Sequence, residues 1–76
     1  GGDDPAATLL RNEDRRRVRD AIGALQPAQQ PVAWLMHVEG CKAREAAAAL
    51  GVPVATVYAD DRYARLELTA MLRDAA

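Results

Sequence analysis

The sequence lacks phenylalanine and contains only one cysteine, one histidine and three aromatic residues. The single Cys41 cannot form an internal disulfide, which is typical of a reducing compartment, so we expect a cytoplasmic protein. His37 has no second histidine or suitably spaced cysteine beside it, so the pattern of a zinc site is missing. No apolar run approaches the roughly 20 residues that span a membrane, and we expect no membrane contact.

The residue patterns of catalysis are also missing. The sequence offers no nucleophile–base pair, no glycine-rich phosphate loop and no acid pair in an evident cleft. We therefore expect a protein that is not an enzyme, with no catalytic residue, no cofactor and no bound metal. A strong basic excess is missing too, since the net charge is −1, whereas free-standing nucleic-acid modules are usually basic.

What the chain does contain is short apolar segments rich in alanine. Half of its 76 residues are hydrophobic, and 17 of these are alanine. A chain of this length buries about 60% of the surface that it exposes when unfolded, so the core is expected to be thin. The sequence predicts an all-α fold, a small four-helix domain with a helix-turn-helix and a long C-terminal helix. Residues 1–8 are interpreted as a linker or a cloning remnant, and residues 9–76 as the domain.

Apolar spacing and helix breakers place the four helices. The first begins near Asn12, has Val18, Ile22 and Leu25 on one face, and ends near Pro27. The second runs from 28 to 38, or from nearer residue 30, because proline is tolerated only in the first turn of a helix. The third covers 42–50 and the last 54–73. An arginine cluster over residues 15–19 is expected to form a solvated face of the first helix.

Three small residues indicate a helix-turn-helix corner. Ala47 allows two helices to pack closely, Gly51 takes a turn with positive φ, and Val57 returns from the next helix to pack on the previous one. Leu50 and Val52 are expected to line this turn. The spacing alone also fits a three-helix packing unit without any DNA-binding role.

Two segments carry a resemblance to a known family. "VRDAIGALQPAQQPVAWLMHVEG" and "CKAREAAAALGVPVATVYADDRYARLEL" resemble region 4 of a bacterial extracytoplasmic-function sigma factor of the sigma-70 family. The likeness spans roughly residues 9–73 and rests on a Leu-Pro turn, a Glu-Gly corner, an "EIA..LG"-like helix and a Thr-Val pair that opens the last helix. It implies binding to the −35 element of promoter DNA and to the flap of the RNA polymerase beta subunit. An anti-sigma factor is a possible further partner.

The last helix departs from the family pattern. Lysine, serine and arginine usually follow the Thr-Val pair, where this chain has Tyr58, Ala59 and Asp60. Asp61 occupies a slot that is usually apolar, and Tyr63 replaces an arginine. An arginine pair that usually precedes the second helix is replaced by glutamines at 29 and 30. The candidate DNA-binding residues are Lys42, Arg44, Ala55, Thr56, Tyr58, Ala59, Arg62 and Arg65. The candidate protein-interaction residues are Asp60, Asp61 and Tyr63.

Asp61 shares a helical face with Val57, Ala64 and Leu68, so it is expected to point toward the core. An unpaired buried carboxylate is costly. Three solutions are open: a pair with Arg65 one turn later, a position at a hydrated rim, or a helix break in which an aspartate caps the next helix. We favour a continuous helix with Asp61 at a paired or hydrated rim.

The sequence leaves two main hypotheses for function. In the first, the domain is the DNA-binding module of an alternative sigma factor and docks its last helix at the −35 element. In the second, it is a divergent sigma region 4-like domain that mainly binds a protein, and its acids select a basic partner. A weaker third hypothesis is the output domain of a LuxR-type regulator.

Overall fold

A computed structural model describes the fold of residues 12–74. Within this range the chain forms four α-helices: α2 (Asn12–Ile22), α3 (Gln30–Ala33), α4 (Ala43–Leu50) and α5 (Val54–Asp74). A π-helix, η1 (Trp34–Val38), follows α3 directly, so α3 and η1 form one helical segment. The described residues contain no strand, and the all-α expectation with a long last helix is confirmed. The interpretation of residues 1–8 as a linker falls outside the described part of the chain.

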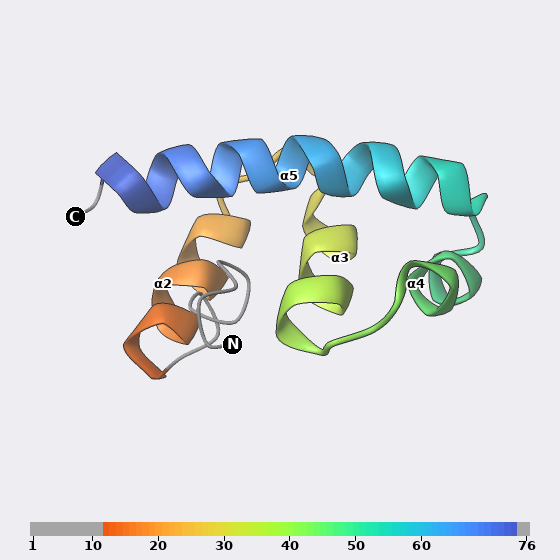
Figure 1. Cartoon of the computed structure of the whole chain (residues 1–76), viewed down its shortest axis with the longest axis horizontal. Helices are drawn as coiled ribbons and strands as arrows, with labels where there is room; N and C mark the ends of the chain where they lie inside the picture. Colours follow the sequence, from red (N-terminus) through yellow and green to blue (C-terminus); the bar gives the residue numbers. More distant parts are fainter. Residues whose placement is uncertain (1–11, 75–76) are drawn as a thin grey trace, which may run out of the picture.

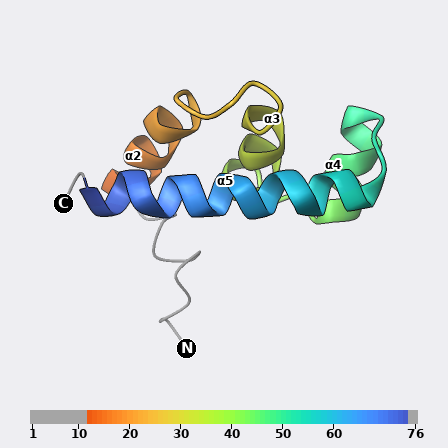
Figure 2. The same cartoon turned by 90° about the horizontal axis from the view of Figure 1, so that it is seen from above.

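The long helix α5 organises the molecule. It runs along one side, and α2, α3 and α4 lie against it in chain order (Figure 1). The view from above shows the same order along its length (Figure 2). Its 21 residues correspond to about 32 Å of helix, close to the 35 Å longest dimension of the molecule. The other three helices therefore pack on α5 rather than around a common centre.

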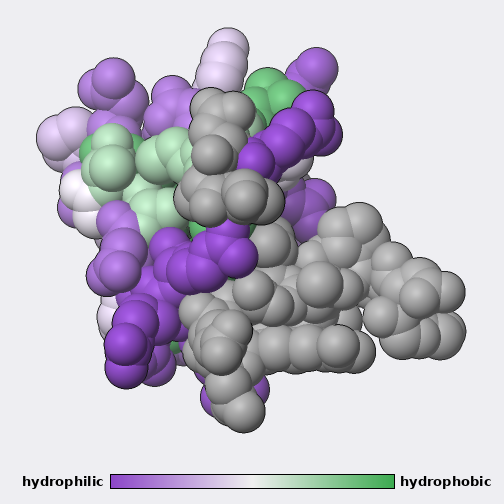
Figure 3. Space-filling view, turned by 90° about the vertical axis from the view of Figure 1, so that its left-hand side faces the viewer, coloured by the Kyte–Doolittle hydropathy of each residue, from purple (hydrophilic) through white to green (hydrophobic). Residues whose placement is uncertain are grey.

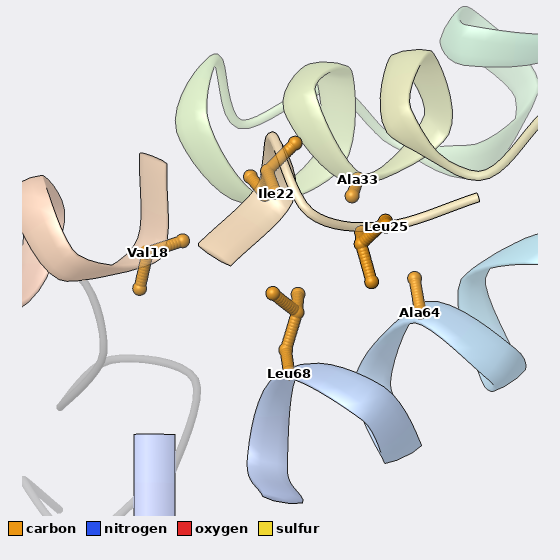
Figure 4. Packing of buried hydrophobic residues seen from close by; sticks show 6 residues of the cluster. All are labelled: Val18, Ile22, Leu25, Ala33, Ala64 and Leu68. Carbon is orange, nitrogen blue, oxygen red and sulfur yellow. The ribbon is translucent and has the colours of Figure 1, made fainter. Parts of the chain in front are cut away.

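Two clusters of buried apolar residues lie side by side along α5. The first joins α2, the α2–α3 connection and the C-terminal half of α5, and Figure 4 shows its side chains converging. The second joins α3, α4 and the first turn of α5. The first cluster contains Val18, Ile22, Leu25, Ala33, Ala64 and Leu68. The second contains Val32, Ala43, Ala46, Ala47 and Val57. The alanines in both clusters explain how short helices approach one another closely.

The second helical segment, which is π-helical in its second half, contacts both clusters. Ala33 belongs to the first cluster and Val38 packs against it, whereas Leu35 and Met36 pack against the second. A π-helix has i→i+5 hydrogen bonds, and here the Glu39 amide donates to the Trp34 carbonyl at 3.1 Å. This wider turn places residues five apart, such as 33 and 38, on the same side. The sequence pattern predicts an ordinary α-helix over this range.

The first helix is shorter than expected. α2 ends at Ile22, and the chain continues through two i→i+3 turns, in which the amides of Ala24 and Leu25 donate to Ala21 and Ile22 at 3.0 Å. Leu25 is nevertheless buried, so it reaches the core from a turn rather than from the helical face. The Gln30 side chain fixes this connection because its Nε2 donates to the Leu25 carbonyl at 2.8 Å.

The arginine cluster of α2 is exposed in part, as expected, but two of its members make specific contacts. Arg17 Nη2 donates to the Leu72 carbonyl at 3.0 Å and so ties α2 to the end of α5. The Arg19 guanidinium lies 5.7 Å from the centre of the Trp34 ring, in cation–π range. At this end of the molecule hydrophilic side chains border a small hydrophobic area (Figure 3).

Candidate nucleic-acid interface

The corner between α4 and α5 has the geometry of a helix-turn-helix. Gly51 adopts φ 69° and ψ 34°, the left-handed conformation that favours glycine, and the Val52 amide donates to the Ala47 carbonyl at 3.1 Å. Ala47 and Val57 are both buried in the second cluster, and Leu50 and Val52 pack against it. The predicted roles of these residues in the turn are confirmed.

The start of each helix in this corner is stabilised locally. The Glu45 carboxylate accepts a hydrogen bond from the Lys42 backbone amide at 2.7 Å, which satisfies one free donor at the start of α4. At the start of α5, the Pro53 carbonyl accepts from the amides of Thr56 and Val57. Both helix N-termini are therefore firmly placed, and side chains near them have defined positions.

All eight candidate DNA-binding residues lie on the surface. Lys42 directly precedes α4 and Arg44 lies in its first turn, and both are exposed. The first half of α5 exposes Ala55, Thr56, Tyr58, Ala59 and Arg62, and Arg65 follows one turn later. Tyr58 keeps 60% of its surface exposed. The structure therefore presents the predicted set on α5 and at the start of α4, on the two helices that meet at Gly51.

The two adjacent aspartates have different environments. Asp60 is half-buried on the flank of α5, whereas Asp61 is only 7% exposed and faces the interior with Val57 and Ala64. Because α5 is continuous through this region, the alternative of a helix break with an aspartate cap does not occur. Asp61 therefore offers little of its carboxylate to a partner, so its burial does not favour the predicted protein-interaction role. Asp60 and Tyr63 remain accessible for that role.

The Asp61 carboxylate is satisfied by a residue that the sequence pattern does not connect with it. His37 Nε2 lies 2.6 Å from Asp61 Oδ1, the distance of a short hydrogen bond between the imidazole and the carboxyl group. The predicted partner Arg65 is also present but more distant, with Nε 3.8 Å from Oδ2. His37 is a partly exposed residue of η1, with 17% of its side chain exposed, and its Nε2 is occupied by this bond.

Only a weak signal in the sequence points to this pair. His37 lies four residues after Ala33, and Ala33 is fully buried, so both lie on the α5 side of their helix. Alanine is so frequent in the chain that Ala33 alone does not mark a core position. The pair joins residues 24 positions apart, and local periodicity cannot predict such a contact.

The exposed surface of α5 has two edges of opposite charge. Arg62, Arg65 and Arg73 share one edge, because they are spaced by three and eight residues. Asp60 and Glu67, seven residues apart, lie on the other edge. An open surface depression of about 580 Å³, called the groove below, follows the basic edge. Its described lining residues all belong to α5, between Tyr58 and Arg73, and include the largely buried Asp61. The adjacent Asp60 and Asp61 therefore do not make the whole exposed surface of α5 acidic.

Comparisons with known proteins add no relative. The chain matches no protein-family model, no curated protein and no solved structure. Among the described helices, none combines the length and the apolar character that crossing a membrane requires. Residues 12–74 also contain no group of three or more metal-ligating side chains. The function must therefore be inferred from the corner, the exposed face of α5 and the sequence resemblance.

Proposed function

We propose that the chain is the DNA-binding module of an alternative sigma factor. In this role the first half of α5 enters the major groove at the −35 promoter element, and the domain contacts the flap of the RNA polymerase beta subunit. The proposal combines the resemblance of the sequence to sigma region 4 with the helix-turn-helix corner at Gly51. In a helix-turn-helix, the second helix usually lies in the major groove of DNA, and its N-terminal residues contact the bases.

One observation carries the proposal: of the two adjacent carboxylates on α5, Asp61 is turned inward, so Asp60 is the one that remains at the surface. Asp61 is buried against His37 and Arg65, and the surface of the first half of α5 instead presents Thr56, Tyr58 and Arg62. Thr56 lies near a helix N-terminus and can donate to a phosphate. Tyr58 and Ala59 offer apolar contact to a thymine methyl group, and Arg62 a phosphate or base contact.

The affinity of the isolated domain is expected to be low. Lys42, Arg44, Arg62 and Arg65 supply three or four phosphate contacts, so the logarithm of the binding constant falls with the logarithm of salt concentration with a slope of about −3. The net charge of −1 provides no further non-specific attraction. Within a longer protein held on RNA polymerase, tethering raises the effective concentration of the domain at the promoter.

The proposal is tested by titrating the domain on duplexes that differ only in the −35 sequence, at two salt concentrations, by fluorescence anisotropy. We expect one sequence class to bind at least tenfold more tightly than the others. Arg62→Ala should weaken binding about threefold to tenfold and make the salt slope less negative by about 1 if Arg62 contacts a phosphate. Equal, weak binding to every duplex contradicts the proposal.

Asp60→Arg is a second, informative variant, because residue 60 is where the family has a basic side chain. Unchanged or weaker promoter binding means that the native surface is adapted to DNA. Binding that appears only in the variant means that the native domain has lost this function. Glu67→Gln removes a similar charge from the same edge, seven residues further along α5, and serves as the control for a general electrostatic gain.

The alternative function is a protein-interaction module of the same descent that binds an anti-sigma factor or a polymerase subunit and has weak or no DNA binding. In the form that the sequence suggests, both aspartates select a basic partner. With Asp61 buried, only Asp60 and Tyr63 of that set are accessible. The positive charge of the opposite edge of α5, where Arg62, Arg65 and Arg73 lie, favours an acidic partner instead.

A further inference from the structure

We propose that the basic edge of α5 is a docking surface for an acidic amphipathic helix of a partner protein. The surface consists of Arg62, Arg65, Leu66, Thr69 and Arg73. It shares Arg62 and Arg65 with the candidate DNA-binding residues and extends beyond them toward the C-terminal end of α5. Its charge is opposite to that of the surface that would select a basic partner. This inference does not depend on DNA binding by the domain.

The surface combines exposed apolar area with positive charge. Leu66 is 62% exposed and lines the groove with Arg62 and Arg73 on either side of it along the helix. A leucine gains nothing from a phosphate backbone, whereas a partner helix can bury it against its own apolar side chains. The groove of about 580 Å³ provides room for such side chains.

The charge and spacing select the partner. Arg62 and Arg73 form no ion pair within the described part of the chain, and Arg65 has only the 3.8 Å contact with Asp61. From residue 62 to residue 73 the helix rises about 17 Å, so three guanidinium groups face about three turns of a helix packed along α5. Glutamate or aspartate side chains at helical spacing on that partner would meet all three arginines.

A second copy of this chain is a poorer occupant. A symmetric pairing of two α5 helices through this surface places arginines of both copies in the same interface, and like charges disfavour it. DNA is also a poorer occupant of the C-terminal half of α5, because this half packs over α2, away from the α4 corner (Figure 1). An acidic amphipathic helix is therefore the partner that can both form ion pairs with the arginines and bury Leu66.

The test uses a synthetic peptide of about 16 residues, long enough to cover this surface. The peptide carries glutamates along one side of a helix and leucines beside them, and isothermal titration calorimetry with the whole 76-residue chain measures its binding. A scrambled peptide of identical composition is the matched control for charge alone. We expect the amphipathic peptide to bind at least tenfold more tightly than the scrambled one.

Variants on the two edges of α5 distinguish this surface from the DNA site. Leu66→Ala and Arg73→Ala should each weaken peptide binding about fivefold to tenfold and leave DNA binding unchanged. Thr56→Ala should weaken DNA binding and leave peptide binding unchanged, and Glu67→Gln on the opposite edge should not weaken peptide binding. These side chains are exposed, and circular dichroism verifies that each variant keeps its helical content.

Three results would overturn the proposal. The first is equal binding of the scrambled and amphipathic peptides. The second is peptide binding that survives both Leu66→Ala and Arg73→Ala. The third is self-association of the chain, measured by analytical ultracentrifugation, that Leu66→Ala abolishes, because the surface would then serve a second copy.

Discussion

At the scale of single residues, the pair of His37 and Asp61 explains how a carboxylate is tolerated at an interior position of a small core. Asp61 lies on α5 between Val57 of one apolar cluster and Ala64 of the other. The imidazole of His37 at 2.6 Å replaces the water that the carboxylate loses on burial. The pair therefore attaches the π-helical segment to α5 at the junction between the two clusters.

Removing one partner should cost more stability than a surface change. Asp61→Ala leaves His37 without its acceptor, and His37→Ala leaves a buried carboxylate with only the distant Arg65, so each should lower the free energy of unfolding by about 1–3 kcal/mol. The double variant should be less destabilised than the sum of the two. Urea denaturation followed by circular dichroism measures all three, with Asp60→Ala as the matched control. Equal effects of Asp61→Ala and Asp60→Ala would show that the pair contributes nothing to stability.

At the scale of elements, the turns at Gly40 and Gly51 set the directions of the helices that follow them. Their φ values are 75° and 69°, and no described non-glycine residue has a positive φ. A Cβ added to Gly51 would find no heavy atom within 4 Å, so space is not what requires glycine there. The requirement comes from the left-handed backbone conformation itself.

The left-handed conformation predicts a graded response to substitution at Gly51. Gly51→Ala should lower the free energy of unfolding by about 1–2 kcal/mol, because an L side chain disfavours the left-handed conformation. Gly51→Asn should cost less, since asparagine tolerates that conformation better. Chemical denaturation of the two variants checks the order. An alanine variant as stable as the parent would mean that the corner can form with another backbone geometry.

The charged edges of α5 are also a property of the element. Periodicity alone separates Arg62, Arg65 and Arg73 from Asp60 and Glu67, so one helix can present opposite charges to two different partners. The adjacent aspartates at 60 and 61 obscure this pattern in the linear sequence. One of them is removed from the surface by its bond to His37.

At the scale of the whole molecule, α5 contributes to both clusters along its length, and so does the segment formed by α3 and η1. The helices α2 and α4 lie at opposite ends of α5 and share no buried cluster (Figure 1). Neither cluster is large, and a domain of this size has a total stability of about 4–11 kcal/mol. Neither cluster is therefore expected to remain folded once α5 has detached.

Unfolding should consequently be a single cooperative transition. Leu68→Ala in the first cluster should lower the free energy of unfolding by about 2–5 kcal/mol, a large part of the total. Fluorescence of Trp34, circular dichroism and hydrogen exchange of the α4 amides should all report the same loss, although α4 does not belong to that cluster. Retained protection of α4 in this variant would show that the two clusters unfold independently.

The helical class, the places of the corners and the buried face of α5 can be predicted from the amino-acid sequence alone. These follow from local rules: proline and glycine interrupt helices, and apolar residues such as Val57, Ala64 and Leu68 repeat at helical spacing. For that reason the predicted α5, residues 54–73, differs from the observed helix by one residue. The same rules placed Asp61 toward the core without identifying what satisfies it.

Which side chains meet across helices depends instead on how the helices pack in three dimensions. The bond from His37 to Asp61, the π-helical turn that allows one segment to face two clusters, and the early end of α2 before Leu25 all depend on packing between distant segments. Such contacts depend on how the helices pack against one another over a small apolar surface. A periodic pattern within one helix indicates the direction in which a side chain points. It does not indicate which residue of another helix the side chain contacts.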